Sequence, residues 1–187
     1  MKMLSEKDNN FHTTAEHEII RQVKEKHCYV ALDYDEEIEK ADESSSLEQT
    51  FELPDGRILS VNSERFRAPE VLFFPQHIGM ESSGIHEVLF ESISRSPIDI
   101  RKTLYHNTIL SGGSTLMEGI EERLTKEMTT FAPSTMDVRI VAPQNRQHLT
   151  WIGGSIMATL SSFFDMCMTR DEYFENGPEL IHHKISI

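Results

Sequence analysis

The chain has 187 residues, 38% of them hydrophobic and 26% charged, which is enough for one substantial core in a globular protein. The net charge of −13 excludes a nucleic-acid-binding surface, because no local cluster of Lys and Arg offsets it. Cys28 and Cys167 are too few and too isolated for a disulfide framework or a zinc site. No apolar run approaches the length of a membrane span and no signal segment follows Met1, so we expect a cytoplasmic, soluble protein without membrane insertion.

A helix and a β-hairpin are predicted in the first third of the chain. Thr13-Thr14-Ala15-Glu16 has the pattern of a capping box, and the positions of Ile19, Ile20 and Val23 give the following helix one apolar face. Residues 29–32 predict a strand, whereas the acidic, Ser-rich residues 36–46 predict an exposed loop or a short frayed helix. Residues 50–53 and 57–61 flank Pro54-Asp55-Gly56, which is typical of a hairpin turn.

Short helices and an apolar loop are predicted in the middle of the chain. Asn62 or Ser63 is placed to cap a helix leading to Pro69, and an apolar loop over residues 72–75 is closed by Gly79. Apolar residues four apart predict a helix over residues 85–94. A second helix opens at Pro97 and ends near Tyr105.

In the central stretch of the chain, residues 107–119, a glycine pair separates a predicted short strand from a predicted helix. Residues 108–110 are β-prone, Gly112-Gly113 interrupts them, and Leu116, Ile120, Leu124 and Met128 recur every fourth residue beyond. A strand that passes through glycines into a helix N-terminus presents unpaired N–H groups to a ligand. The alternative is a plain tight turn.

The last third is predicted to contain a strand and two helices. Residues 138–142 alternate as a strand that ends at Pro143. Residues 151–164 form an apolar helix in which Gly153-Gly154 allows close backbone approach, and Thr169 caps a last short helix that Gly177-Pro178 ends. The fold class is therefore α/β with mixed connections.

Five stretches of this sequence resemble one protein family. Ile109-Leu110-Ser111-Gly112-Gly113-Ser114-Thr115 resembles the adenosine-side motif of the actin, hexokinase and heat-shock chaperone superfamily. The others resemble the actin family itself, in its order and almost without gaps: Thr13-Thr14-Ala15-Glu16 running on to Lys24-Glu25-Lys26, Phe51-Glu52-Leu53-Pro54-Asp55-Gly56, Gly79-Met80-Glu81-Ser82 with Gly84-Ile85-His86-Glu87, and Trp151-Ile152-Gly153-Gly154-Ser155-Ile156.

The resemblance covers essentially the whole chain and implies the C-terminal half of the actin-like ATPase fold, which is ribonuclease H-like. Residues 1–80 would form a part like actin subdomain 4, residues 81–148 a part like subdomain 3, and residues 149–187 the C-terminal part of subdomain 1. Met1-Lys2-Met3-Leu4 resembles an internal stretch of actin, so we expect a longer protein of which this chain is one half.

The resemblance also implies a wall for the adenosine part of ATP or ADP. Its expected residues are Lys24 and Glu25 beside adenine and ribose, Gly113 at the backbone approach, and Leu116 and Met117 over the base. Family members carry an aromatic residue in place of Met117 and a lysine in place of Gln147, and losing both contacts costs about 1–3 kcal/mol of affinity. Without the resemblance, Lys24-Glu25-Lys26 is a solvated helix end.

The phosphates and Mg²⁺ of the nucleotide would need residues of the full-length protein that this sequence does not supply. It shows no second Gly-rich hairpin for the phosphates and no carboxylate matching the metal site. Phosphoryl transfer depends on such groups, so we expect no ATP hydrolysis by this chain alone. His86 and His106 are interpreted as structural.

Partners are implied at two places. Residues Ile152, Ile156, Met157, Leu160 and Met166 match the actin cleft that receives helices of actin-binding proteins, and the alternative for them is core packing. Residues 74–84 match the hydrophobic plug that contacts other actin subunits in a filament, and the alternative is a packed core loop.

Three functions are compatible with these patterns. The first is an actin-family cytoskeletal protein that binds ATP and forms filaments when full length. The second is a truncated actin-like interaction module without nucleotide function. The third, a sugar kinase or chaperone fragment, is disfavoured by the hairpin, plug and Trp151-Ile152-Gly153-Gly154-Ser155 matches.

Overall fold

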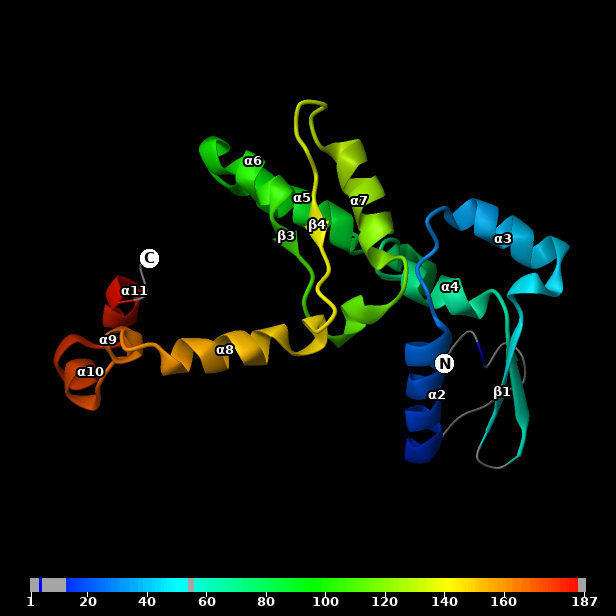
Figure 1. The fold of residues 1–187 in the computed structure, drawn as a ribbon, viewed down its shortest axis with the longest axis horizontal. Helices are drawn as coiled ribbons and strands as arrows, with labels where there is room; N and C mark the ends of the chain where they lie inside the picture. The colour runs from blue at the N-terminus through cyan, green and yellow to red at the C-terminus, as the bar shows by residue number, and fades with distance from the viewer. Residues whose placement is uncertain (1–3, 5–12, 54–55, 185–187) are drawn as a thin grey trace.

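The computed structural model describes residue 4 and residues 13–53 and 56–184. Figure 1 shows an assembly of helices with two small sheets. Its helices are α2 (Thr14–His27), α3 (Tyr34–Glu43), α4 (Glu64–Glu70), α5 (Ile85–Arg95), α6 (Ile98–His106), α7 (Ile120–Phe131), α8 (Leu149–Thr159), α9 (Phe163–Met166), α10 (Arg170–Asn176) and α11 (Leu180–Lys184). Its strands are β1 (Gln49–Glu52), β2 (Ile58–Val61), β3 (Thr108–Ile109) and β4 (Ile140–Val141). The combination confirms the α/β class.

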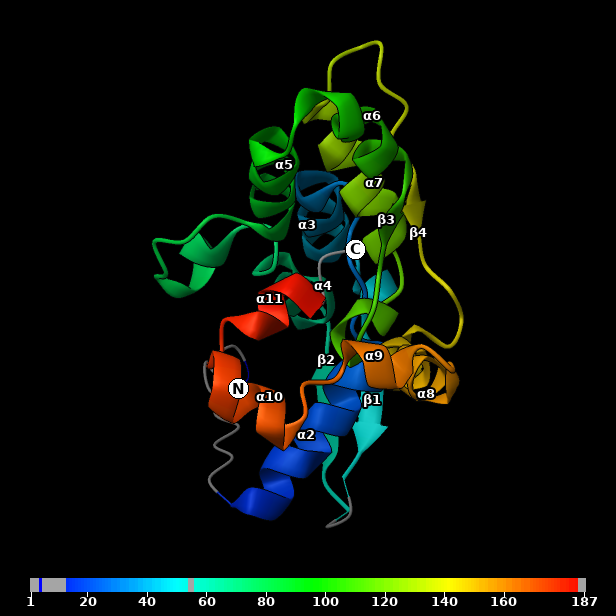
Figure 2. The ribbon, with the colours of Figure 1, turned by 90° about the vertical axis from the view of Figure 1, so that its left-hand side faces the viewer.

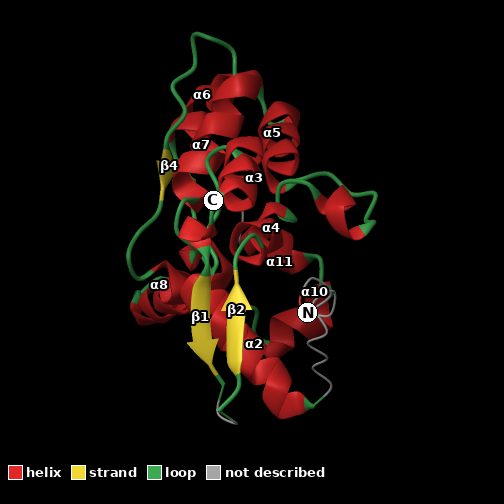
Figure 3. Ribbon diagram, turned by 90° about the vertical axis from the view of Figure 1, so that its right-hand side faces the viewer, coloured by secondary structure: helices red, strands yellow, loops and turns green. Residues whose placement is uncertain are grey.

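Helix α2 packs beside the antiparallel β1–β2 hairpin (Figure 3). The predicted capping box is present, because Thr13 N–H donates to the Glu16 carboxylate at 2.8 Å and Glu16 N–H donates to the Thr13 hydroxyl at 3.2 Å. Val23 is buried against the hairpin. Gly56 takes a φ of +81° in the turn, as predicted, while Pro54 and Asp55 lie outside the described residues.

Between the helix and the hairpin one prediction was wrong, and a second was right only in its helical alternative. Residues 29–32 form no strand, and only Tyr29 makes a bridge, with Glu118. The stretch predicted as a loop or frayed helix contains the ten-residue α3, followed by a 3₁₀ helix, η1 (Ser45–Leu47). Helix α3 forms because Asp33 caps its first turn and Ala41 is buried in a cluster with Phe66.

The segment around α4 differs in detail from the prediction. Ser63 precedes α4 but its side chain makes no capping hydrogen bond, and Pro69 lies inside the last turn. A 3₁₀ helix, η2 (Pro75–Ile78), and Gly79 with a φ of +77° follow. Met80 is 52% exposed, and most of residues 74–84 are exposed with it. This segment is therefore not a packed core loop.

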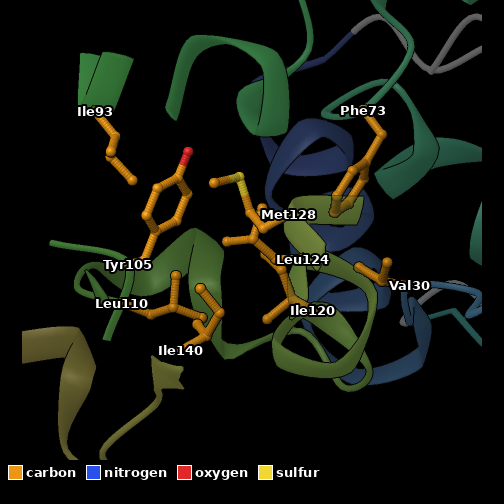
Figure 4. Packing of buried hydrophobic residues seen from close by; sticks show 9 residues of the cluster. All are labelled: Val30, Phe73, Ile93, Tyr105, Leu110, Ile120, Leu124, Met128 and Ile140. Atoms are coloured by element: carbon orange, nitrogen blue, oxygen red, sulfur yellow. The ribbon is translucent and has the colours of Figure 1, made fainter. Parts of the chain in front are cut away.

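Helix α7 is the centre of the largest core (Figure 4). Strands β3 and β4 pair in parallel, Thr108 with Ile140 and Ile109 with Val141, and α7 connects them. The helices predicted over residues 85–94 and from Pro97 are α5 and α6, and they cover the same core. Apolar residues from α5, α6, α7 and β4, and Leu110 directly after β3, meet in this core.

The helix after the glycine pair begins later than predicted. The 3₁₀ helix η3 (Gly113–Leu116) begins at the second glycine of the pair, Met117 leaves the helical conformation, and α7 starts only at Ile120. Gly119 has a φ of +80°, and a Cβ there would lie 2.2 Å from the Val30 carbonyl oxygen. The backbone of residues 29–32 therefore packs against Gly119 between η3 and α7. As a result, Leu116 lies outside α7.

A buried ion pair joins α4 to α7. The Arg123 guanidinium donates to both Glu70 oxygens, at 2.8 and 3.1 Å, and to the Ala31 carbonyl at 2.8 Å. Side-chain exposure is 4% for Arg123 and 0% for Glu70. The pair fixes α4 and residues 29–32 against the central helix.

Helices α8 to α11 form an arm that leads away from the rest of the molecule (Figures 1 and 2). The helix predicted over residues 151–164 is broken, because Leu160 is extended and α9 starts at Phe163. Apart from the chain neighbours and the backbone of α8 itself, no described atom lies within 4 Å of a Cβ added at Gly153 or Gly154, so the predicted close approach of another segment is absent. Thr169 caps α10 as predicted, but α11 follows it and was missed. No helix of the described ranges is long and apolar enough to cross a membrane.

Candidate functional site

A cavity of about 360 Å³ lies between α2 and η3, and we call it the α2–η3 cavity. It is lined by Arg21, Lys24 and Glu25 of α2, by Gly113, Ser114, Leu116 and Met117 of η3 and its end, and by Gln147 of a further 3₁₀ helix, η4 (Arg146–His148). All five residues expected at the adenosine wall are among them. The tertiary structure therefore brings together two segments that are far apart in the sequence.

The α2 wall is set by the capping box and by burial of the opposite helix face. Because Val23 packs on the hairpin, Arg21, Lys24 and Glu25 lie on the free side of the helix. Arg21 donates to Glu18 at 2.7 Å and its Nη1 lies 3.7 Å from the Glu25 carboxylate. The hydrogen bond from Arg21 lowers the pKa of Glu18. The Lys24 ammonium forms no hydrogen bond or ion pair with a described residue and is therefore available to a ligand.

The glycine turn forms the opposite wall. Gly112 has a φ of +98°, and its carbonyl accepts from both the backbone N–H and the hydroxyl of Thr115, at 3.1 and 2.7 Å. A Cβ at Gly113 would lie 3.9 Å from Cγ of Gln147, on the cavity side. The absent side chain leaves the main chain open to a close contact. The helix N-terminus predicted directly behind the pair is absent, since η3 intervenes.

Arg146 holds the two halves of this wall together, and no sequence pattern predicts this role. Its Nε donates to the Thr115 carbonyl at 2.8 Å, and its own carbonyl accepts from Gly112 N–H at 2.8 Å. Its Nη1 donates to the carbonyls of Ala142 and Pro143 at 3.3 and 3.1 Å. Arg146 therefore fixes η3 against η4 and places Gln147 at the cavity. Only long-range contacts reveal this role.

The cavity combines an apolar surface with a polar rim. Leu116 is 42% exposed and Met117 half-buried, which gives a flat ring an apolar surface to lie on. Arg21, Lys24 and Glu25 supply charges of both signs. Such a site can orient a ring that carries hydroxyl groups. No group of three His, Cys, Asp or Glu side chains able to hold a metal occurs among the described residues.

The residues expected to bind partner helices lie on the arm. Ile156, Met157 and Leu160 are 58%, 45% and 48% exposed, while Ile152 and Met166 are half-buried. Ile152, Ile156 and Met157 lie on α8, but Leu160 follows that helix and Met166 ends α9. The structure therefore places three of the five residues on one helix.

A search with models of protein families gave a match over almost the whole chain. The model of the family described as Actin matches residues 1–186. The matched range includes both walls of the α2–η3 cavity and the whole of α8.

Proposed function

Because this chain belongs to the actin family, we propose that the α2–η3 cavity holds the adenosine end of ATP or ADP. In this proposal the chain is the C-terminal half of an actin-like ATPase fold, and the full-length protein is a cytoplasmic cytoskeletal subunit that assembles with other actin subunits. The phosphates and Mg²⁺ are held by residues outside this chain.

The convergence of two distant segments on one cavity carries the proposal. Lys24 and Glu25 come from α2 and Gly113 from the glycine turn, and a Cβ at Gly113 would point toward Gln147. Leu116 and Met117 offer the apolar surface that a purine requires, and the Glu25 carboxylate can accept hydrogen bonds from ribose hydroxyls. In this proposal these residues contact the base and the ribose of the nucleotide but not its phosphates.

Calorimetric titration of the chain with adenosine, ADP and ATP tests this assignment. We expect the three affinities to agree within about threefold, because base and ribose provide the contacts. Lys24→Met should weaken binding about fivefold, whereas Lys26→Met, on the same helix but outside the cavity, should not. A strong preference for ATP, or equal effects of the two variants, would contradict the proposal. ATP turnover by this chain alone should not exceed background.

An interaction module without nucleotide function is the second candidate, and the exposure of α8 favours it. Trp151 is 74% exposed and residues 149–162 carry no Asp, Glu, Lys or Arg. An uncharged, exposed helix suits the apolar face of an amphipathic partner helix, as actin-binding proteins would provide.

The exposed Trp151, which is the sole Trp of the chain, gives the second candidate its assay. Titration with an amphipathic helical peptide should shift the Trp151 fluorescence to shorter wavelength. Ile156→Asp should abolish the shift, whereas Ile58→Asp, at an exposed position of β2, should not. Peptide binding without any adenosine binding would favour the interaction module over the nucleotide-binding protein.

A further inference from the structure

A second cavity, of about 270 Å³, lies where α5, α6 and the end of α7 meet. We call it the α6 cavity. It shares no lining residue with the α2–η3 cavity. It is smaller than the roughly 300–1,000 Å³ of sites for drug-sized ligands, so only a small ligand fits.

Aromatic and apolar side chains make up the walls of the α6 cavity. The rings of Phe90 and Phe131 stack with centroids 5.3 Å apart and an interplanar angle of 26°. Pro133 and Met136 extend this surface, and Ile98, which is 75% exposed, contributes to the lining from α6. These side chains suit a flat or branched hydrocarbon body.

Tyr105 places a hydroxyl without a protein partner at the α6 cavity. The residue is only 4% exposed, and its hydroxyl forms no hydrogen bond with any described residue. Figure 4 shows the hydroxyl pointing away from Leu110 and Ile140, at the edge of the core cluster. Buried tyrosine hydroxyls usually have a partner. The oxygen is not among the fully covered, unpaired side-chain atoms of the described residues, so a molecule in the cavity, water or a ligand, can reach it.

Arg101 is the only charged residue that lines the α6 cavity in the described part of the chain. Its Nε donates to the Ser96 carbonyl at 2.9 Å, which fixes the guanidinium, while its two terminal nitrogens bind no described residue. Ser94 adds a second hydroxyl without a described partner. A guanidinium that presents free N–H groups beside apolar walls recognises a carboxylate.

We propose that the α6 cavity binds a small organic acid with an aromatic or branched hydrocarbon body. Arg101 binds its carboxylate, the rings of Phe90 and Phe131 contact its body, and Tyr105 supplies a further hydrogen bond. This site does not depend on the nucleotide proposal, since no residue is common to both cavities.

Two matched probes test the proposal on the 187-residue chain: 3-phenylpropionate and its uncharged amide, 3-phenylpropanamide. The methyl signals of Ile98 and Met136 report binding by NMR. We expect the acid to shift both signals with a dissociation constant of about 1 mM or less, and the amide to bind about tenfold more weakly. Equal binding of acid and amide, or no shift of either signal, would overturn the proposal.

Variants of the polar groups separate recognition from packing. Tyr105→Phe keeps the ring and should weaken binding of the acid about fivefold, because the hydroxyl is lost. Arg101→Met should remove the preference for acid over amide, and Arg101→Lys should restore part of it. Lys102→Met, the neighbouring cation on α6 outside the cavity lining, should change nothing. If Lys102→Met reduced the preference as much as Arg101→Met, general charge and not this site would explain the binding.

Discussion

The buried pair of Glu70 and Arg123 allows a quantitative test of how α4 is held against α7. Glu70 is fully buried, and its carboxylate has no partner among the described residues besides Arg123. Arg123 has two further acceptors, the Ala31 carbonyl at 2.8 Å and Glu127 at 2.6 Å. Removing Arg123 therefore leaves Glu70 unpaired, whereas removing Glu70 leaves Arg123 with two acceptors.

The two single substitutions should lower the free energy of unfolding by different amounts because of these contacts. Arg123→Met leaves the Glu70 carboxylate without any donor and should cost about 4–5 kcal/mol, the upper end for a broken buried pair. Glu70→Met leaves Arg123 with Ala31 and Glu127 and should cost about 3 kcal/mol. The double variant replaces both charges by apolar side chains. It should cost about 2–3 kcal/mol, because the Ala31 carbonyl and Glu127 still lose their donor and the Phe73 ring, 4.8 Å away, loses the guanidinium.

Urea unfolding followed by circular dichroism measures all three free energies of unfolding. Lys40→Met is the control, because Lys40 pairs with Glu37 at the surface with 58% of its side chain exposed, and its cost should stay below about 1 kcal/mol. Additive costs in the double variant, or a smaller loss for Arg123→Met than for Glu70→Met, would refute the reasoning.

Two further predictions concern the backbone at Gly119 and the acid stability of the arm. Gly119→Ala should destabilise the chain by several kcal/mol, since its Cβ would meet the Val30 carbonyl at 2.2 Å. Gly112→Ala has a φ of +98° and a ψ of 157° but meets no such atom within 4 Å, so it should cost less, about 1–3 kcal/mol, in the same urea assay. The hydrogen bond from Lys184 lowers the pKa of Glu172 to about 2. This contact therefore stabilises the packing of α10 against α11 at any pH above the unfolded pKa of about 4.3. The stabilisation is lost as the pH falls from about 4.3 through 2. NMR titration of the Glu172 carboxyl should show a midpoint near 2 that rises toward 4.3 in Lys184→Met; an unchanged midpoint would contradict the assignment.

Residues within a few positions of one another determined much of the secondary structure. The Thr13 and Thr169 capping boxes start α2 and α10 because the pairing groups lie three residues apart. The β1–β2 hairpin follows from Gly56 between two β-prone runs, and α5 from apolar residues at helical spacing. The failures over residues 29–32 and at the start of α7 have one cause, since Val30 N–H donates to Glu118 and the two chains exclude any side chain at Gly119.

The α2–η3 cavity shows the same division between local and tertiary information. The sequence alone determined that Lys24 and Glu25 lie near the end of a helix and that glycines follow a strand, and the family resemblance named them as one site. Only the tertiary structure decided that they share a cavity. Packing of Val23 on the hairpin orients α2, and two hydrogen bonds, from the Arg146 guanidinium to the Thr115 carbonyl and from Gly112 N–H to the Arg146 carbonyl, hold the glycine turn to η4. Those contacts join residues distant in the chain, and no local pattern encodes them.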